Sequence, residues 1–323
     1  MKRITKYTTF HQLSKIKEFK PFYKYLTPQR ILRKGIRKRF VTIRRYEEVW
    51  ETGPIVEGLN HLRDLVNSEH QVFYNLSSKE EIEKDPSLAE RVLFHLPVEK
   101  KAKFVFIVPG GGYSSVIHFS SGIPFGKRLN DMGYHVFFVN YRIEELAKHP
   151  NPIDDLAKGL EFVVKNADKL NVDIGDYALM GVSAGGHAAA AFGLDNIGYA
   201  KYDLPKPGAM ILVYPVITMG ELSHVGSRKY FMGDDINNTE LEDLYSVEKQ
   251  VGQNYPPTFV WQCVKDEQVP IENTRMLAEA LEKHQVPFIY ESYDDFGHGW
   301  GLAETKAAKG WLERSIAFWQ ENI

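Results

Sequence analysis

The chain has 323 residues, a mass of 37.1 kDa, 43% hydrophobic and 25% charged residues, a composition that indicates a folded globular protein and excludes a disordered chain. Its single cysteine, Cys263, excludes an internal disulfide and a cysteine-based metal cluster. The net charge of -2 hides an asymmetry, because residues 1–45 hold fifteen Lys and Arg side chains against one carboxylate, that of Glu18.

The N-terminal 45 residues interleave these basic side chains with aromatic and aliphatic ones, and Pro21 and Pro28 predict that any helices there are short. One interpretation is a patch that binds an anionic membrane or a nucleic acid. The other is an extension that packs its aromatic side chains on the acidic body or covers the active site. We favour the second and expect no nucleic-acid partner, because no nucleic-acid-binding motif accompanies the charge. A weak membrane contact through residues 1–45 is kept as the alternative.

The next residues alternate between predicted strands and helices. Apolar runs predict strands at 71–76, 91–98, 103–108, 135–140, 176–180, 209–216, 258–264 and 288–293. Helices are predicted at 125–132, 152–170, 187–192, 271–284 and 305–320, with an irregular insertion at 219–255. This order predicts an α/β fold with a mainly parallel sheet and helices on both faces, in which sites form beyond the carboxyl ends of the strands.

The sequence GVSAGG at residues 181–186 lies between a predicted strand and a predicted helix. In a Gly-x-Ser-x-Gly turn, small residues two before and two after the serine allow a strained backbone that exposes the hydroxyl. The motif therefore predicts a nucleophile elbow with Ser183 as the nucleophile. A glycine-rich turn without chemistry is the alternative.

A serine hydroxyl needs a histidine to accept its proton, and a carboxylate to orient that histidine. His298 lies in a glycine-flanked loop after the last predicted strand, and Asp266 follows the strand at 258–264. The order serine, acid, histidine is the one that elbow enzymes use. Competing carboxylates are those of Glu267, Asp294 and Asp295.

The oxyanion of a tetrahedral intermediate needs hydrogen-bond donors, which backbone N–H groups commonly supply. We predict Gly111, Gly112 and Ala184 as these donors, because the loop after the strand at 103–108 and the residue after the nucleophile are the expected sources. A plain tight turn is an alternative. A phosphate-binding loop is disfavoured, because no Lys-Ser or Lys-Thr follows these glycines. His187 is expected to pack beside the elbow helix, and Cys263 to be a buried small hydrophobic residue.

Four motifs together resemble the α/β-hydrolase esterases of the hormone-sensitive-lipase-like and acetyl-xylan-esterase-like groups. They are VPGGGY, GVSAGGHAAA, VKDEQVP and DDFGHGWGL, in that order along the chain. The resemblance implies an eight-stranded sheet, a triad of Ser183, Asp266 and His298, and hydrolysis of carboxylic esters without a cofactor or metal. Pro109 stands where many members of these groups carry histidine, and residues 1–65 fall outside the resemblance.

These observations predict a serine carboxylesterase for short-chain, acetyl-type esters, with small acyl groups favoured over long ones mainly because of the resemblance. Alternatives are a serine peptidase or amidase with the same triad, and a non-catalytic protein that binds anionic surfaces. We expect residues 1–65 to form the extension or lid, and residues 66–323 the catalytic domain. Without a run of 18 apolar residues or an apolar leader, the chain is expected to be cytoplasmic.

Overall fold

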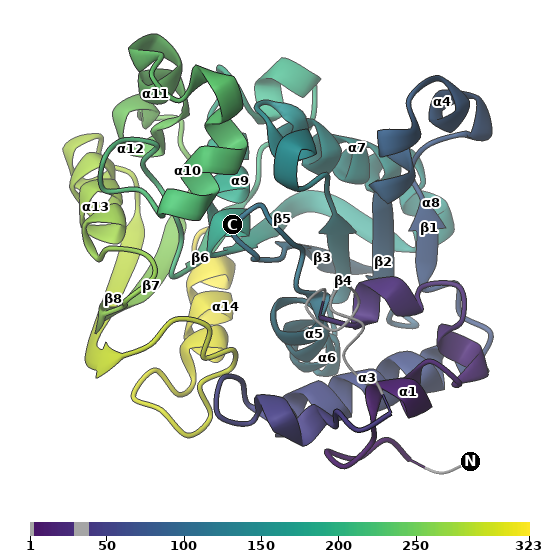
Figure 1. The fold of residues 1–323 in the computed structure, drawn as a ribbon. Helices are drawn as coiled ribbons and strands as arrows, with labels where there is room; N and C mark the ends of the chain where they lie inside the picture. The colour runs from purple at the N-terminus through teal and green to yellow at the C-terminus, as the bar shows by residue number, and fades with distance from the viewer. Residues whose placement is uncertain (1–2, 29–38) are drawn as a thin grey trace.

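The computed structural model describes residues 3–28 and 39–323, whose strands form one eight-stranded sheet (Figure 1). The strands lie in the order β1-β2-β4-β3-β5-β6-β7-β8. β2 runs antiparallel to both β1 and β4, and every other pair of neighbouring strands in this sheet is parallel, so the predicted mainly parallel sheet is confirmed. The bounds are β1 (Phe73–Asn75), β2 (Val92–Leu96), β3 (Ala102–Val108), β4 (His135–Asn140), β5 (Val172–Val182), β6 (Ala209–Val213), β7 (Thr258–Lys265) and β8 (Phe288–Phe296).

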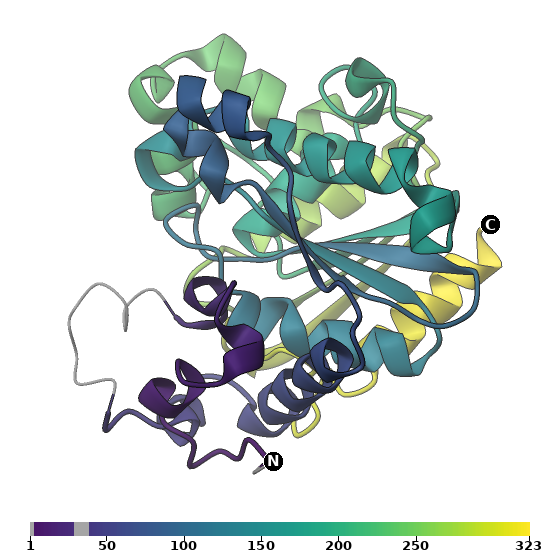
Figure 2. The same cartoon turned by 90° about the vertical axis from the view of Figure 1, so that its right-hand side faces the viewer.

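Helices cover both faces of the sheet, as Figure 2 shows from the side. One layer holds α7 (Asn151–Lys165), α8 (Ala167–Leu170), α9 (Ala184–Phe192), α10 (Val225–Met232), α11 (Thr239–Tyr245), α12 (Val247–Gln250) and α13 (Glu272–Lys283). The other holds α1 (Phe10–Leu13), α3 (Thr52–Asn67), α5 (His118–Ser121), α6 (Ile123–Asp131) and α14 (Trp311–Glu321). The remaining elements are α4 (Lys79–Lys84) and the 3-10 helices η1 (Lys17–Phe19), η2 (Tyr23–Leu26), η3 (Ile43–Tyr46), η4 (Pro86–Glu90), η5 (Glu144–Ala147), η6 (Tyr199–Tyr202) and η7 (Gly233–Asp235).

The central strands are buried on both sides, which explains their continuous apolar sequences. In β3, Phe104 and Phe106 belong to the hydrophobic core on one face of the sheet, and Val105 and Ile107 belong to the core on the other. All four are 0% exposed. A parallel strand between two helical layers has no solvent-facing side, so alternation with polar residues is absent from it.

Several boundaries differ from those that the sequence predicts. The helix predicted at 305–320 begins only at Trp311, because Gly310 adopts a left-handed backbone with φ of 79°. The helix predicted at 152–170 ends at Lys165, and a separate turn, α8, follows Asn166. The stretch 219–255, for which the sequence indicates irregular structure, contains α10, α11 and α12; the caps of α10 and α11 are His224 and Asn238.

The N-terminal segment lies on the α3–α6 side of the molecule (Figures 1 and 2). Its aromatic side chains belong to the hydrophobic core on that side. The Phe10 ring lies 5.5 Å from that of Phe119, and the Phe22 ring lies 5.5 Å from that of Phe94. Part of the predicted basic patch, residues 29–38, lies outside the described residues. No helix within the described ranges is long and apolar enough to span a membrane.

Three buried histidines stay neutral in the folded chain. Burial lowers the pKa of His95 to about 3, and those of His118 and His187 to about 4, from an ordinary value of 6.5. The unfolded chain therefore binds protons between about pH 6.5 and pH 4 that the folded chain does not. Stability contributed by these neutral imidazoles is present at neutral pH and is lost as the pH falls through this window.

We predict that replacing His118 by Leu reduces this acid sensitivity. The variant should lose about 2 kcal/mol less unfolding free energy than the wild type between neutral pH and about pH 4.5, because it lacks one site of proton uptake on unfolding. Urea denaturation at several pH values measures this difference. Parallel pH profiles of the wild type and His118→Leu would contradict the prediction.

Candidate active site

Ser183 lies on a strained turn between β5 and α9. Its φ of 55° and ψ of -122° are unfavourable for a residue that carries a side chain. Two backbone hydrogen bonds hold this conformation: the Ser183 N–H donates to the Val213 carbonyl, and the Ser183 carbonyl accepts from the Val216 N–H, both at 3.0 Å. The end of β6 thus fixes the turn, and the hydroxyl points beyond the carboxyl ends of the strands.

The glycines around Ser183 are required by close backbone contacts. A Cβ atom on Gly185 would lie 2.2 Å from the Val108 carbonyl oxygen and 2.4 Å from that of Pro109. A Cβ atom on Gly181 would lie 2.7 Å from the Gly185 carbonyl oxygen. A side chain at Gly185 would push the turn away from the end of β3, and one at Gly181 would push it away from the start of α9.

The structure brings Ser183, His298 and Asp266 into one hydrogen-bonded row. His298 Nε2 lies 2.8 Å from Ser183 Oγ, and His298 Nδ1 lies 2.7 Å from Asp266 Oδ2. With Nδ1–H donating to the carboxylate, Nε2 is the acceptor for the serine hydroxyl proton. Ser183 is 9% exposed, and the side chains of His298 and Asp266 are 9% and 0% exposed. Such a row can activate a serine nucleophile.

Asp266 is held in place by its own loop. Its Oδ1 accepts hydrogen bonds from the N–H groups of Gln268 and Val269, at 2.9 and 3.0 Å, and its Oδ2 accepts one from Gln262 Nε2 at 3.2 Å. The competing carboxylate of Asp294 forms an exposed ion pair with Lys265 instead.

Tyr214 supports the imidazole, a role that the sequence alone did not suggest. Its ring lies 4.6 Å from the ring of His298 and packs edge-on against Trp261. The strand predicted at 209–216 ends at Val213, and Tyr214 takes a positive φ of 36°. This turn aims the side chain at His298. A tyrosine directly before Pro215 at a strand end is the available sequence signal.

The loop after β3 presents free backbone donors. Tyr141 Oη donates to the Pro109 carbonyl at 2.7 Å, and the Gly110 N–H donates to Ser121 Oγ at 3.2 Å. These two hydrogen bonds brace the loop, although position 109 carries no histidine. Gly111 and Gly112 take positive φ angles of 145° and 65°. Within residues 3–28 and 39–323, the N–H groups of Gly111, Gly112 and Ala184 have no hydrogen-bond acceptor. They are available to an oxyanion.

His187 connects three segments around the site. Its Nδ1 accepts a hydrogen bond from Tyr113 Oη, and its Nε2–H donates to the Tyr245 carbonyl, both at 2.8 Å. His187 is fully buried on α9, as the sequence indicates.

Cys263 is also buried, and burial raises the pKa of its thiol to about 12, which suits a small hydrophobic residue rather than a nucleophile.

His224 is a second neighbour that sequence reasoning missed. Its Nδ1 accepts from the Ser227 N–H at 3.1 Å, so its proton lies on Nε2. A Cβ atom on Gly112 would lie 3.3 Å from the His224 ring, which places the imidazole against the glycine loop. Burial, and then the nearby His298, lower the pKa of His224 and keep it neutral.

Across the described ranges, no group of three or more His, Cys, Asp or Glu side chains could hold a metal ion.

Comparison with known proteins identifies relatives of this chain. Residues 94–281 match the BD-FAE family model. The chain is 31% identical over 221 residues to Endo-1,4-beta-xylanase B of Butyrivibrio fibrisolvens, covering 65% of this chain and 34% of that protein. It is 29% identical over 246 residues to the acetylxylan esterase of Xylanibacter ruminicola, covering 74% and 49%. The chain thus spans about a third to a half of the length of these two relatives.

A solved structure agrees with these matches. The acetyl ester-xyloside bifunctional hydrolase from Caldicellulosiruptor lactoaceticus superposes with a TM-score of 0.64 at 32% identity, covering 71% of this chain and 87% of that chain. The eight-stranded α/β-hydrolase fold that the resemblance implies is therefore confirmed.

We predict that Gly185→Ala destabilises the chain by about 3 kcal/mol or more, because the new methyl group would overlap the carbonyl groups at the end of β3. Gly53→Ala is the matched control: a Cβ atom there meets nothing within 4 Å, and the variant should keep or gain up to about 1 kcal/mol. Urea denaturation compares the two. Equal unfolding free energies would refute the close-packing argument.

Proposed function

The chain belongs to the BD-FAE family of α/β-hydrolase esterases, and on this premise we propose that it is a serine carboxylesterase for short-chain, acetyl-type esters. The observation that carries the proposal is the continuous row of hydrogen bonds from Asp266 through His298 to Ser183 on a strained elbow. The acetyl preference draws support from the names of two relatives, an acetylxylan esterase and an acetyl ester-xyloside hydrolase.

In the proposed reaction, Ser183 Oγ attacks the ester carbonyl carbon while His298 Nε2 accepts the hydroxyl proton. The negative charge that develops on the carbonyl oxygen is stabilised by the N–H groups of Gly111, Gly112 and Ala184. Because these N–H groups have no acceptor among the described residues, binding an oxyanion would break none of the protein's own hydrogen bonds.

His298 then donates its proton to the leaving alkoxide oxygen, the bond between that oxygen and the acyl carbon breaks, and an acyl-enzyme remains on Ser183. A water molecule, deprotonated by the same imidazole, hydrolyses this ester and restores the serine hydroxyl. Asp266 keeps the Nδ1–H tautomer and stabilises the imidazolium that forms twice in the cycle. The substrate is accordingly a small-molecule ester, and the protein supplies every acid, base and donor that the steps require.

We predict that purified protein hydrolyses p-nitrophenyl acetate and that Ser183→Ala lowers kcat/KM by at least about 10⁴-fold. Asp266→Asn should lower kcat by about 10³- to 10⁴-fold, because the amide no longer favours the required imidazole tautomer. Asp294→Asn, which changes an exposed carboxylate in the same region, should retain nearly the full rate. A Ser183→Ala variant with undiminished activity would disprove the assignment.

We further predict that kcat/KM falls as the acyl chain is lengthened from acetyl to butyryl and octanoyl in a p-nitrophenyl ester series. p-Nitroacetanilide, which has the same acyl group on an amide, should be a far poorer substrate than the acetate ester. A preference for the anilide would instead identify an amidase with the same three residues.

A further inference from the structure

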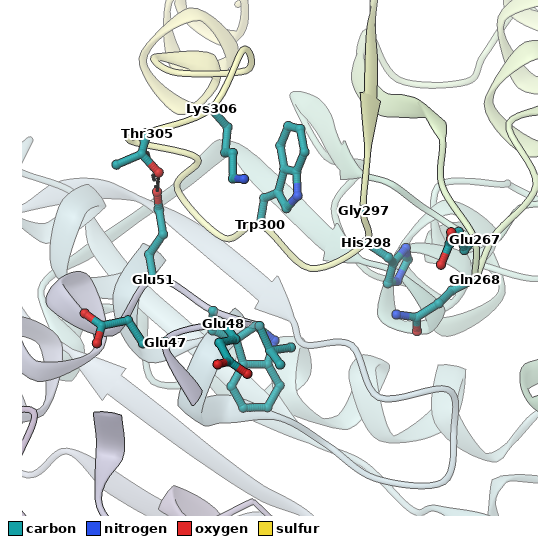
Figure 3. A pocket seen from close by; sticks show the side chains of 12 residues that line it. Glu47, Glu48, Glu51, Glu267, Gln268, Gly297, His298, Trp300, Thr305 and Lys306 are labelled. Carbon is teal, nitrogen blue, oxygen red and sulfur yellow. Dashed lines mark hydrogen bonds between the residues drawn. The ribbon is translucent and has the colours of Figure 1, made fainter. Parts of the chain in front are cut away.

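A cleft of about 430 Å³ adjoins His298 and is built by separate parts of the chain (Figure 3). Residues 47–51, which follow η3, line it on one side, and the loop from Gly297 to Lys306 lines it on another. Glu267 and Gln268, from the loop that carries Asp266, complete the lining. The segment 47–51 lies outside the stretch that matches the family model.

The position of this cleft matches one part of an ester substrate. In the proposed reaction His298 Nε2 must deliver a proton to the oxygen of the leaving alcohol, so the alcohol lies on the side of His298. The cleft touches His298, whereas the oxyanion donors Gly111, Gly112 and Ala184 are not among its lining residues. We propose that the cleft is the subsite for the leaving alcohol, that residues 47–51 determine its specificity, and that it accepts neutral or cationic alcohols and disfavours anionic ones. This inference rests on the proposed esterase function.

The segment 47–51 is attached firmly enough to act as a wall. The Trp50 ring stacks on Tyr46 with centroids 5.0 Å apart and planes at 12°, and packs at 6.0 Å from Phe119. Trp50 also lies against the loop that carries His298, since a Cβ atom added to Gly299 would lie 3.4 Å from Trp50 Nε1. Trp50 therefore joins the N-terminal segment to the loop that carries the histidine.

Glu51 makes a second connection to the same loop. Its carboxylate accepts hydrogen bonds from the Thr305 N–H at 3.0 Å, from Thr305 Oγ1 at 3.1 Å and from the Glu304 N–H at 3.1 Å, and Figure 3 shows the contact with Thr305. The loop from Gly297 to Lys306 begins directly before His298. Glu51 is thus a positioning residue, which acts on the reaction through the loop that it holds.

The charge of the lining predicts which alcohols the cleft accepts. Four of its side chains are carboxylates and one is an ammonium group, that of Lys306, which lies 5.2 Å from the centre of the Trp300 ring. Glu47 is paired with Lys6 at 3.0 Å, and within the described residues Glu48 and Glu267 have no ion-pair partner. A concave site with an excess of carboxylates attracts cations and repels anions.

The test compares three acetate esters that differ in the charge of their alcohol. They are 2-(trimethylammonio)ethyl acetate, its uncharged isostere 3,3-dimethylbutyl acetate, and the anionic 3-acetoxypropionate. Their kcat/KM values cover the steps up to departure of the alcohol, so a slow later hydrolysis of the shared acetyl-enzyme does not mask differences. For each variant, the ratio of kcat/KM for a charged ester to that for the neutral ester is compared with the same ratio in the wild type. This comparison cancels the intrinsic reactivity of the esters.

Glu48→Gln and Glu267→Gln should each lower the ratio of cationic to neutral ester about threefold, and together about tenfold, as expected for a unit charge several ångströms away in a partly solvated site. The ratio of anionic to neutral ester should rise correspondingly. High salt should shrink both effects. Glu282→Gln, an exposed carboxylate on α13, is the control and should leave the ratios unchanged.

Trp50 and Glu51 test the wall itself. Trp50→Ala should raise KM for the esters with bulky alcohols while leaving the acyl-chain preference unchanged, and Trp50→Phe should restore much of the loss. Glu51→Ala should lower kcat because the His298 loop loses its anchor, whereas Glu51→Gln, which keeps an acceptor oxygen, should recover part of it.

The outcomes separate this inference from the function on which it rests. Hydrolysis that depends on Ser183, with charge ratios unaltered in both single glutamine variants, would overturn the subsite and leave the esterase intact. Absence of any hydrolysis that depends on Ser183 would overturn both. Because Glu48 and Glu267 are exposed, their substitution does not threaten folding.

Discussion

The geometry of this molecule depends on the left-handed backbone of Ser183. A residue with a side chain keeps such a conformation only where its surroundings compensate for the strain, and here the compensation comes from β6, through hydrogen bonds of the Ser183 backbone with Val213 and Val216. The same pairing turns the chain at Tyr214, whose ring supports His298. The strain at the serine and the placement of the histidine thus share one origin at the end of β6.

The rest of the site is arranged around this turn by the edge of a parallel sheet. The carboxyl ends of β3, β5, β7 and β8 supply the glycine loop, the serine, the aspartate and the histidine in turn. Because every one of these strands is parallel to its neighbours, short loops suffice to bring the four together. The two hydrophobic cores on opposite faces hold the sheet rigid beneath them.

Sequence reasoning reached the residues that a local pattern marks. Ser183 lies in a five-residue motif, and His298 and Asp266 follow apolar strands in the order that elbow enzymes use, so pattern and chain order suffice to select them. His224 and the segment 47–51 carry no such mark, and the one local signal at Tyr214 is its place directly before Pro215. Their proximity to His298 or Gly112 arises from how distant segments pack, and neither propensity nor spacing encodes it. The late start of α14 has a local reason, since Gly310 can adopt either a helical or a left-handed backbone and the amphipathic pattern around it does not decide between them.

His187 places a constraint on how such a protein can be altered. A neutral imidazole uses both nitrogens here, one toward the Tyr113 hydroxyl in the glycine loop and the other toward the Tyr245 carbonyl at the end of α11. Few side chains could offer an acceptor and a donor at opposite ends of a flat ring in a fully buried position. The glycine loop and the helices of 219–255 are consequently not exchangeable modules. A grafted glycine loop would have to keep a hydroxyl at the place of Tyr113, and a grafted 219–255 segment would have to keep a backbone carbonyl at the place of Tyr245, so the two segments are tied to the same imidazole.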